Sequence, residues 1–195
     1  MKILYFDTET TGIDPKANAM VQISGMIEID GVIKETFDIK MRPGEKDVID
    51  PKALEVIGKT KEEIMTYQSA EDARKQLTVM FSKYVDKFDR KDKFTPAGYN
   101  VKFDIDFLHN LFLKCGDAYF GSWVAWQGVD VLALIYYMKY LGAIELPNYK
   151  LETVCKYFEV EIKAHDALAD ITATKQVLEK IKDMITIKSL QPTLL

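Results

Sequence analysis

The stretch KILYFDTETTG, residues Lys2 to Gly12, decides the fold because it joins an apolar strand to a pair of acids. Its first part, Lys2 to Asp7, is apolar almost throughout, which predicts a central strand buried on both faces and ending at Asp7. Strand side chains alternate between the two faces, so Asp7 and Glu9 point to the same side. Two such carboxylates repel each other unless a cation lies between them. Small residues then let a substrate backbone approach closely: Thr8, Thr10, Thr11 and Gly12.

A further acid, Asp104, follows a second short apolar strand that runs from Phe94 to Ala97. That strand stops at Gly98, and the amphipathic run from Val101 to Leu113 predicts a helix with Asp104 in its first turns. Acids near a helix start are favoured by the helix dipole and need no other role. The position of Asp104 alone therefore leaves a structural and a functional role open.

His165 and Asp170 open the last long helix, which we expect to run from His165 to Ile185. Residues five apart do not stack on one face of a regular helix, so His165 is expected on the entering loop or in a distorted first turn. An unperturbed histidine pKa of about 6.5 suits removal of a proton from water near neutral pH. The other histidine, His109, has no comparable partners and is expected to be an ordinary surface or core residue.

Taken together, these motifs resemble those of the DEDDh group of 3′-to-5′ exonucleases, which includes proofreading epsilon subunits of bacterial DNA polymerases and oligoribonucleases. The family pattern D-x-E-T-T-G is matched from Asp7 to Gly12, and G-x-N-x-x-F-D from Gly98 to Asp104. The pattern H-x-A-x-x-D is matched from His165 to Asp170. The resemblance covers nearly the whole chain. It implies an α/β, ribonuclease-H-like fold: a mixed sheet with antiparallel first strands and helices on both faces.

The resemblance also implies roles for individual residues. Two Mg²⁺ or Mn²⁺ ions per active site would be held by four acids: Asp7, Glu9, Asp104 and Asp170. His165 would take a proton from the attacking water. Contacts with the 3′-terminal nucleotides would come from six residues: Thr8, Thr10, Thr11, Gly12, Asn100 and Phe103. Tyr99 stands where many relatives carry a histidine, and Asp130 and Asp166 are extra acids that could assist as ligands or cap helices.

These roles predict a metal-dependent exonuclease that releases nucleoside monophosphates from the 3′ end of single-stranded DNA or RNA, with DNA favoured, in proofreading or repair. A haloacid-dehalogenase-like phosphatase also has two acids one residue apart after an apolar strand, but its pattern has Asp where Glu9 stands. A non-catalytic nucleic-acid-binding module of the same fold is the other alternative. Candidate protein partners are a DNA polymerase subunit and a sliding clamp, the latter through Gln191 to Leu195.

Composition agrees with one domain, which we place at residues 1–186, followed by a tail at 187–195. With 195 residues and 48% hydrophobic content, the chain can bury roughly 70% of its unfolded surface. The 26 Lys plus Arg and 30 Asp plus Glu give a net charge of −4. Few phosphates should therefore be held outside the site, and we expect weak, salt-sensitive substrate binding.

The expected remaining elements are strands and helices separated by clear turn signals. Strands are expected at residues 21–29 and 32–41, joined by an Asp30-Gly31 hairpin turn, and near Val124. Helices are expected at 51–57, 60–65, 69–88 and 129–141, and from Pro147, with a charged loop at 86–93. No apolar run is long enough for a bilayer and no signal pattern is present, so a cytoplasmic protein without a membrane partner is expected. Cys115 and Cys155 are expected to be buried free thiols.

Overall fold

A five-stranded mixed sheet forms the centre of the computed structural model, which describes residues 1–162 and 167–190. The strand order is β3-β2-β1-β4-β5. β1 (Lys2–Thr10) pairs antiparallel with β2 (Met20–Ile29), and β2 pairs antiparallel with β3 (Val32–Lys40). On its other side β1 pairs parallel with β4 (Thr95–Gly98), which pairs parallel with β5 (Val129–Asp130). The predicted sheet with antiparallel first strands is therefore confirmed.

The central position of β1 agrees with its apolar sequence. Leu4 and Phe6 are buried on one face and Tyr5 on the other, as the alternation of strand side chains requires. β1 does not end at Asp7 as expected, because its pairing with β2 continues to Thr10. Asp7 and Glu9 therefore lie within the strand. The predicted hairpin turn is present, and Asp30 and Gly31 adopt positive φ angles of 50° and 83°, which suit the tight turn between twisted strands.

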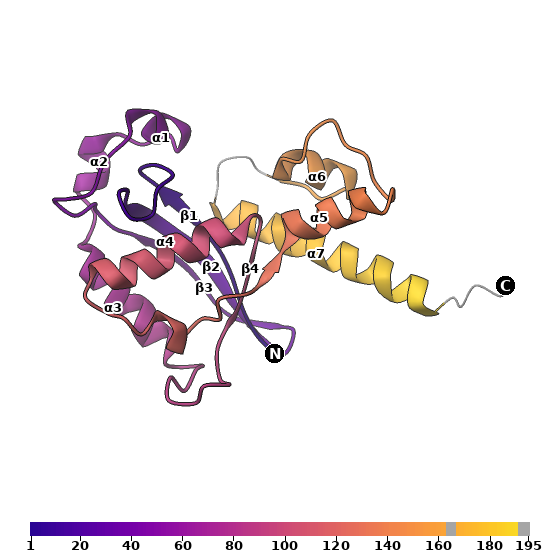
Figure 1. Ribbon diagram of the computed structural model, residues 1–195, viewed down its shortest axis with the longest axis horizontal. Helices are drawn as coiled ribbons and strands as arrows, with labels where there is room; N and C mark the ends of the chain where they lie inside the picture. Colours follow the sequence, from indigo (N-terminus) through magenta and orange to yellow (C-terminus); the bar gives the residue numbers. More distant parts are fainter. Residues whose placement is uncertain (163–166, 191–195) are drawn as a thin grey trace.

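Helices cover both faces of the sheet, as expected (Figure 1). α3 (Ala70–Phe81) and α4 (Val101–Lys114) pack on one face, and α7 (Ala167–Leu190) lies on the other. Short elements complete the described chain: α1 (Pro51–Val56), α2 (Lys61–Met65), the 3₁₀ turn η1 (Phe120–Ser122), α5 (Val131–Tyr140) and α6 (Leu151–Tyr157). Thr60 caps α2 through the backbone N–H of Glu63 at 3.1 Å, as its capping pattern predicted.

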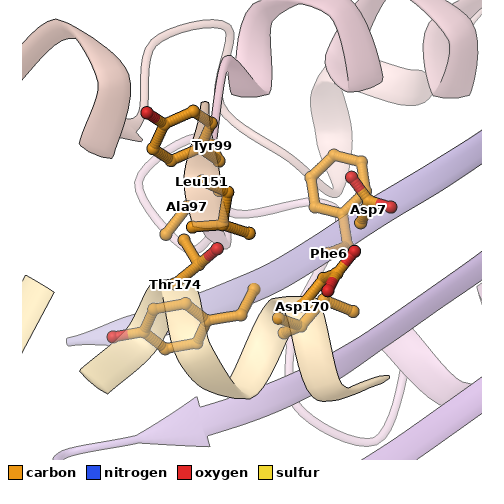
Figure 2. Close-up of a pocket in the computed structure, with 10 residues that line it drawn as sticks. Phe6, Asp7, Ala97, Tyr99, Leu151, Asp170 and Thr174 are labelled. Carbon is orange, nitrogen blue, oxygen red and sulfur yellow. The ribbon is translucent and has the colours of Figure 1, made fainter. Parts of the chain in front are cut away.

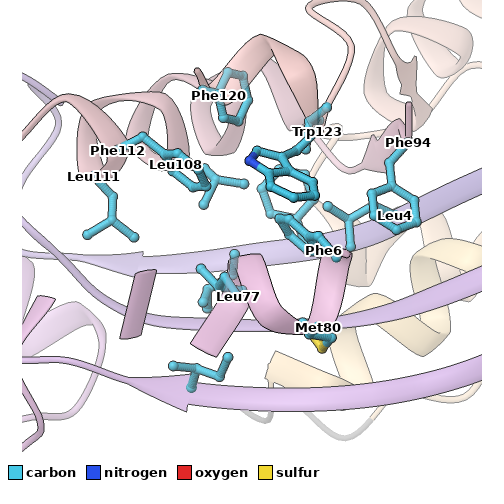
Figure 3. Packing of buried hydrophobic residues seen from close by; sticks show 14 of the residues in the cluster. Leu4, Phe6, Leu77, Met80, Phe94, Leu108, Leu111, Phe112, Phe120 and Trp123 are labelled. Carbon is cyan, nitrogen blue, oxygen red and sulfur yellow. The ribbon is translucent and has the colours of Figure 1, made fainter. Parts of the chain in front are cut away.

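Two large hydrophobic clusters hold these layers together. The main cluster lies between the sheet and the helices α3 and α4, and includes Leu4, Phe6, Phe94 and Trp123 (Figure 3). The second cluster joins α5, α6 and α7 through residues such as Ile135, Val154 and Val177. A small third cluster of Tyr5, Met26, Ala97 and Ile171 connects the sheet to α7. The last helix thus packs both against the sheet and against α5 and α6.

Several element boundaries differ from the sequence prediction. α3 ends at Phe81, and the segment predicted to continue it to Phe88 forms turns, one of which is held by the Lys2 ammonium group on the carbonyl of Tyr84. Val129 and Asp130 form strand β5 because they pair with β4, so the helix predicted from Val129 starts at Val131. Only a single bridge joins Val124 to Phe94. α6 starts at Leu151, after the expected position, and α7 extends to Leu190, into the expected tail.

Several smaller expectations can also be compared with the structure. Cys115 and Cys155 are free thiols, the first half-buried and the second buried. His109 packs its ring against Phe120 and Trp126 at 5.4 and 4.7 Å between centroids, so it is the ordinary packed residue expected. Within the described ranges, no helix combines the length and apolar character needed to cross a membrane. The tail peptide Gln191 to Leu195 lies outside the described residues.

Candidate active site

A pocket of about 210 Å³ lies where β1 and β4 meet α6 and α7. Asp7 of β1 and Asp170, in the first turn of α7, lie at one end of this pocket (Figure 2). Tyr99, Leu151 and Thr174 lie at the other end. The fold therefore brings an acid from the start of the chain beside one from its last helix, as the motifs predicted.

The electrostatic environment of Asp7 is strongly negative. Burial raises the pKa of this carboxyl group most, and the negative charges of Glu9 and Asp170 raise it further, to about 7. A hydrogen bond from the backbone of Thr8 acts in the opposite direction and lowers it. Because the charges of Glu9 and Asp170 both raise the pKa of Asp7, three of the four predicted ligands lie close to one another.

The fourth predicted ligand, Asp104, is held against β1 from the first turn of α4. Its side chain is buried, and its Oδ1 atom accepts two hydrogen bonds from Thr8, from the backbone N–H at 3.0 Å and from the hydroxyl at 2.7 Å. Burial and the charge of Asp7 raise the pKa of Asp104 well above its ordinary value, whereas the two bonds from Thr8 lower it. Thr8 thus fixes one carboxylate oxygen of Asp104 beside Asp7.

Asp130 stabilises the turn that leads into α4. Asn100 adopts a left-handed conformation with φ 62°, and its backbone N–H donates to Asp130 Oδ1 at 3.0 Å. The same oxygen accepts the N–H of Leu132 at 3.0 Å and so caps α5. Of the two roles that the sequence left open for Asp130, the structure shows the capping role.

The threonine and glycine residues of the first motif mostly serve the local structure. The Thr10 hydroxyl donates to the carbonyl of Gly12 at 2.7 Å. Thr11 is fully buried, donates to the carbonyl of Val48 at 2.8 Å and accepts the N–H of Ala19 at 2.9 Å. The Thr11 side chain is therefore enclosed by its own loop, and a substrate contact of Thr11 stays a prediction.

Gly12 is required for a different contact from the one expected. A Cβ atom at this position would lie 2.4 Å from the side chain of Asn18, so glycine permits close packing within the protein. Phe103 is half-buried and packs its ring 4.8 Å from that of Phe107. Substrate contacts of Thr8, Thr10, Gly12, Asn100 and Phe103 remain predictions.

Most residues that line the pocket were not predicted as ligands or substrate contacts, and three of them are Tyr99, Leu151 and Thr174. The Tyr99 hydroxyl donates to the carbonyl of Tyr149 at 2.5 Å, which fixes one wall of the pocket next to α6. Leu151 reaches the pocket from the start of α6. Thr174 lies one helical turn after Asp170, so the i, i+4 spacing on α7 could have identified it.

The donor atoms at this site suit a hard divalent cation. Carboxylate oxygens are the ligands that Mg²⁺ and Mn²⁺ prefer. The repulsion that raises the Asp7 pKa is the kind that such a cation would relieve. Among residues 1–162 and 167–190, no three or more Asp, Glu, His or Cys side chains are arranged so that they could hold a metal ion. The acids instead interact in pairs through Asp7, and His165 lies outside the described residues.

Comparisons with known proteins agree with this geometry. The model of the RNase T family, described as an exonuclease, matches residues 4–178. A curated relative, the PolC-type DNA polymerase III of Bacillus cereus, is 24% identical over 182 residues, which are 92% of this chain and 11% of the polymerase. The chain therefore spans about a tenth of the length of that relative.

Solved structures of Escherichia coli exonuclease I are similar in fold. The complex with a dA16 oligonucleotide has a TM-score of 0.76 and 21% identity, covering 93% of this chain and 41% of that chain. The zinc-bound form of the complex with single-stranded DNA has a TM-score of 0.77 and 22% identity, covering 94% and 40%. The chain thus spans about two fifths of exonuclease I.

These similarities confirm the ribonuclease-H-like fold expected from the motifs. The family match includes every strand of the sheet as well as Asp7, Glu9, Asp104 and Asp170. It also rejects the haloacid-dehalogenase-like alternative, because one exonuclease model accounts for the first motif and for the later ones together. The chain belongs to the exonuclease family.

Proposed function

We propose that this protein is a divalent-metal-dependent 3′-to-5′ exonuclease that releases nucleoside monophosphates from single-stranded DNA. The observation that carries the proposal is the meeting of Asp7 and Asp170 in one pocket, with Glu9 and Asp104 acting on the same position. Three acids that each interact unfavourably with Asp7 are costly for a protein with no cation to bind, and one of them, Asp104, is buried. Their presence supports catalysis over a module that only binds.

The site residues would have three separate roles: binding the metal ions, orienting a ligand and accepting a proton. Two Mg²⁺ or Mn²⁺ ions, when bound, supply neutralisation of charge at the scissile phosphate and activation of water. Their ligands would be four acids: Asp7, Glu9, Asp104 and Asp170. Thr8 orients Asp104 through its two hydrogen bonds. His165 would accept the proton of the attacking water, a role that rests on the sequence motif.

The shape of the pocket supports a single-stranded substrate. It is narrow, at about 210 Å³, and the apolar side chain of Leu151 and the ring of Tyr99 flank it. A terminal nucleotide must be splayed away from a partner strand to enter such a space. Among the relatives, the PolC-type protein is a DNA polymerase and the exonuclease I structures contain DNA strands, which supports DNA as substrate and a role in replication or repair.

The test follows nucleotide release from DNA and RNA strands labelled at the 3′ end or the 5′ end, with Mg²⁺, Mn²⁺ or EDTA. We expect metal-dependent release of the 3′ label as a nucleoside monophosphate. Asp104→Asn should lower the rate roughly 10³-fold or more. The matched control is Asp106→Asn, on the same helix, whose carboxylate pairs with Lys102 and should retain activity.

Other outcomes would contradict the proposal in distinct ways. Release of inorganic phosphate alone would indicate a phosphatase, and binding without release would indicate a non-catalytic module. His165→Ala should reduce turnover while leaving Mg²⁺ binding, measured by calorimetry, mostly intact. If His165→Ala and Asp7→Ala lost the same metal affinity, the assignment of His165 as base would be overturned.

A further inference from the structure

A second and larger cavity, of about 690 Å³, lies away from the acids. It is formed by α3, the charged loop that follows it and the segment around η1. We call it the aromatic cavity and define it by six lining residues: Arg74, Lys87, Phe88, Arg90, Tyr119 and Trp123. Nothing in the proposed exonuclease mechanism uses these side chains.

Aromatic side chains form the base and the walls of this cavity. Trp123 is buried and packs against Phe81 of the main cluster, with 6.4 Å between ring centroids, so it provides a rigid base (Figure 3). Phe88 and Tyr119 are 84% and 73% exposed, respectively. Exposing large apolar rings to water is unfavourable, and rings beside a cavity are available to stack with a ligand.

The charged groups that line the cavity leave an excess of positive charge. The one acid among them, Asp117, accepts a hydrogen bond from Arg74 Nη1 at 3.0 Å and is thereby paired. Lys87 and Arg90 form no ion pair within the described residues. The Lys87 ammonium group lies 5.2 Å from the ring centroid of Phe88 and 5.8 Å from that of Trp123.

Two acids of the same loop accept hydrogen bonds from backbone N–H groups. Asp86 accepts the N–H of Phe88 at 3.0 Å, and Asp89 accepts the N–H of Lys91 at 2.8 Å. These bonds hold the loop in shape and direct its carboxylates to the main chain. The side chains that line the cavity thus include three cations and one acid, although the whole chain carries a net charge of −4.

We propose that the aromatic cavity is a second contact site for single-stranded nucleic acid, binding nucleotides on the 5′ side of a strand whose 3′ end occupies the active site. Open aromatic rings beside unpaired cations match the chemistry of such strands, because bases stack on the rings and phosphates pair with the cations. Two exposed ring faces favour successive bases over an acidic peptide, which needs the cations alone. The inference rests on the proposed function.

The position of the cavity relative to the active site is compatible with one strand. Gly98, at the end of β4, lines the active-site pocket, whereas Phe94 precedes β4 and bridges to Val124 beside Trp123. The cavity lies on the face of the sheet covered by α3, whereas Asp7 and α7 lie on the other face. A strand that reaches both sites must pass around the sheet, so it needs more nucleotides than a trinucleotide held in the active site provides.

The test compares a trinucleotide with a strand of about 20 nucleotides, using the full chain. Anisotropy in EDTA measures binding without cleavage, and initial rates in Mg²⁺ give kcat/KM. The double variant Lys87→Glu/Arg90→Glu should weaken binding of the long strand about tenfold, and Phe88→Ala about fivefold or more. For the trinucleotide, kcat/KM should stay within about twofold of wild type, because its binding depends on the active site.

Matched controls carry equal changes elsewhere on the surface. Lys52→Glu/Lys61→Glu makes the same charge change on exposed side chains of α1 and α2, and Tyr140→Ala removes a ring that is 83% exposed on α5. Both should leave long-strand affinity within about twofold. Equal losses in the control and cavity variants, or equal losses for both substrate lengths, would overturn the proposal.

Three further outcomes separate this proposal from the proposed function and from binding of a different ligand at the cavity. Wild-type protein that binds the long strand through the cavity but releases no nucleotide would refute the nuclease assignment alone. Nuclease activity that is the same in all variants would refute the second site alone. Variant-sensitive binding of an acidic peptide, without any effect on the long strand, would show that the cavity serves a protein partner and that the proposal is wrong.

Discussion

At the residue scale, the carboxyl group of Asp7 links the chemistry of the site to the stability of the protein. Its pKa of about 7 in the folded state is well above the value of about 3.9 for an unfolded aspartate. The folded state therefore binds this proton more tightly than the unfolded state. Without a cation, its stabilising contribution is fully present below about pH 4 and is lost as the pH rises through 7.

Asp7→Asn should remove this pH dependence. In EDTA, the free energy of unfolding of the variant at pH 8 should exceed that of wild type by on the order of 2 to 4 kcal/mol, and the two should agree near pH 4. Urea denaturation at several pH values would measure the difference. A variant as pH-sensitive as wild type would contradict the electrostatic role of Asp7, and Asp106→Asn provides a control from the same protein.

The Thr8 hydroxyl is the second group whose role can be tested at this scale. Thr8→Val removes the 2.7 Å bond to buried Asp104 while keeping the size of the side chain. We expect a loss of about 1 to 3 kcal/mol at pH 8, because a buried acceptor loses one of its two donors. Thr8→Ser keeps the hydroxyl and should recover most of both stability and Mg²⁺ affinity. Equal behaviour of the two variants in denaturation and calorimetry would exclude this positioning role.

The sequence could single out the four acids as candidate ligands, because each lies in a short motif whose spacing reflects one strand or one helix turn, and their role as ligands stays a prediction. It could not predict that Thr11 turns inward, since its bonds to Ala19 and Val48 depend on how distant segments pack. The wall formed by Tyr99 was hidden for the same reason, because its partner Tyr149 lies in a later loop. The role of His165 remains a prediction.

At the element scale, β5 is short but fixes the position of Asp130. The close approach of β5 to β4 depends on Gly128, where a Cβ atom would lie 2.1 Å from the carbonyl oxygen of Pro96. The sequence predicted a helix here, because two residues of strand adjoining an apolar helical run leave no periodic signal. Pairing with β4 then determined the conformation.

Gly128→Ala should therefore be severely destabilising. We expect a loss of about 3 kcal/mol or more in the free energy of unfolding, since backbone on backbone contact leaves no side chain to move aside. Gly31→Ala is the control, because Gly31 has φ 83° but no heavy atom within 4 Å of its Cβ position. It should cost only about 1 kcal/mol. Similar losses in thermal or urea unfolding would contradict the steric argument.

One ion pair adds to the hydrophobic contacts that attach α7 to the sheet. Lys175 Nζ lies 3.2 Å from Glu28 Oε2, with the two side chains only 17% and 9% exposed. Lys175→Met would leave Glu28 buried beside no close cation, and should cost about 3 to 5 kcal/mol. Adding Glu28→Gln should restore part of this loss in urea denaturation. Lys180→Met, exposed on the same helix, should have little effect, and an equal effect would refute the pairing argument.

At the scale of the whole molecule, net charge sets the expected mode of substrate binding. With −4 overall and two unpaired cations at the aromatic cavity, few phosphate contacts are available. Each contact contributes a slope of about −0.7 to the dependence of log K on log salt for single strands. We expect a total slope no steeper than about −3 and short runs of cleavage per encounter. Removal of hundreds of nucleotides per encounter in a competitor-trap assay at moderate salt would contradict this.

The separation of the hydrophobic clusters has a consequence for how activity can be lost. Asp7, Glu9 and Asp104 are supported by the sheet and the main cluster, whereas Asp170 belongs to a helix that also takes part in the separate cluster with α5 and α6. Local unfolding of α5, α6 and α7 would move Asp170 away from the other three acids, while the strands would keep their protection against hydrogen exchange. Inactive protein with an intact sheet is thus an expected early product of mild denaturation.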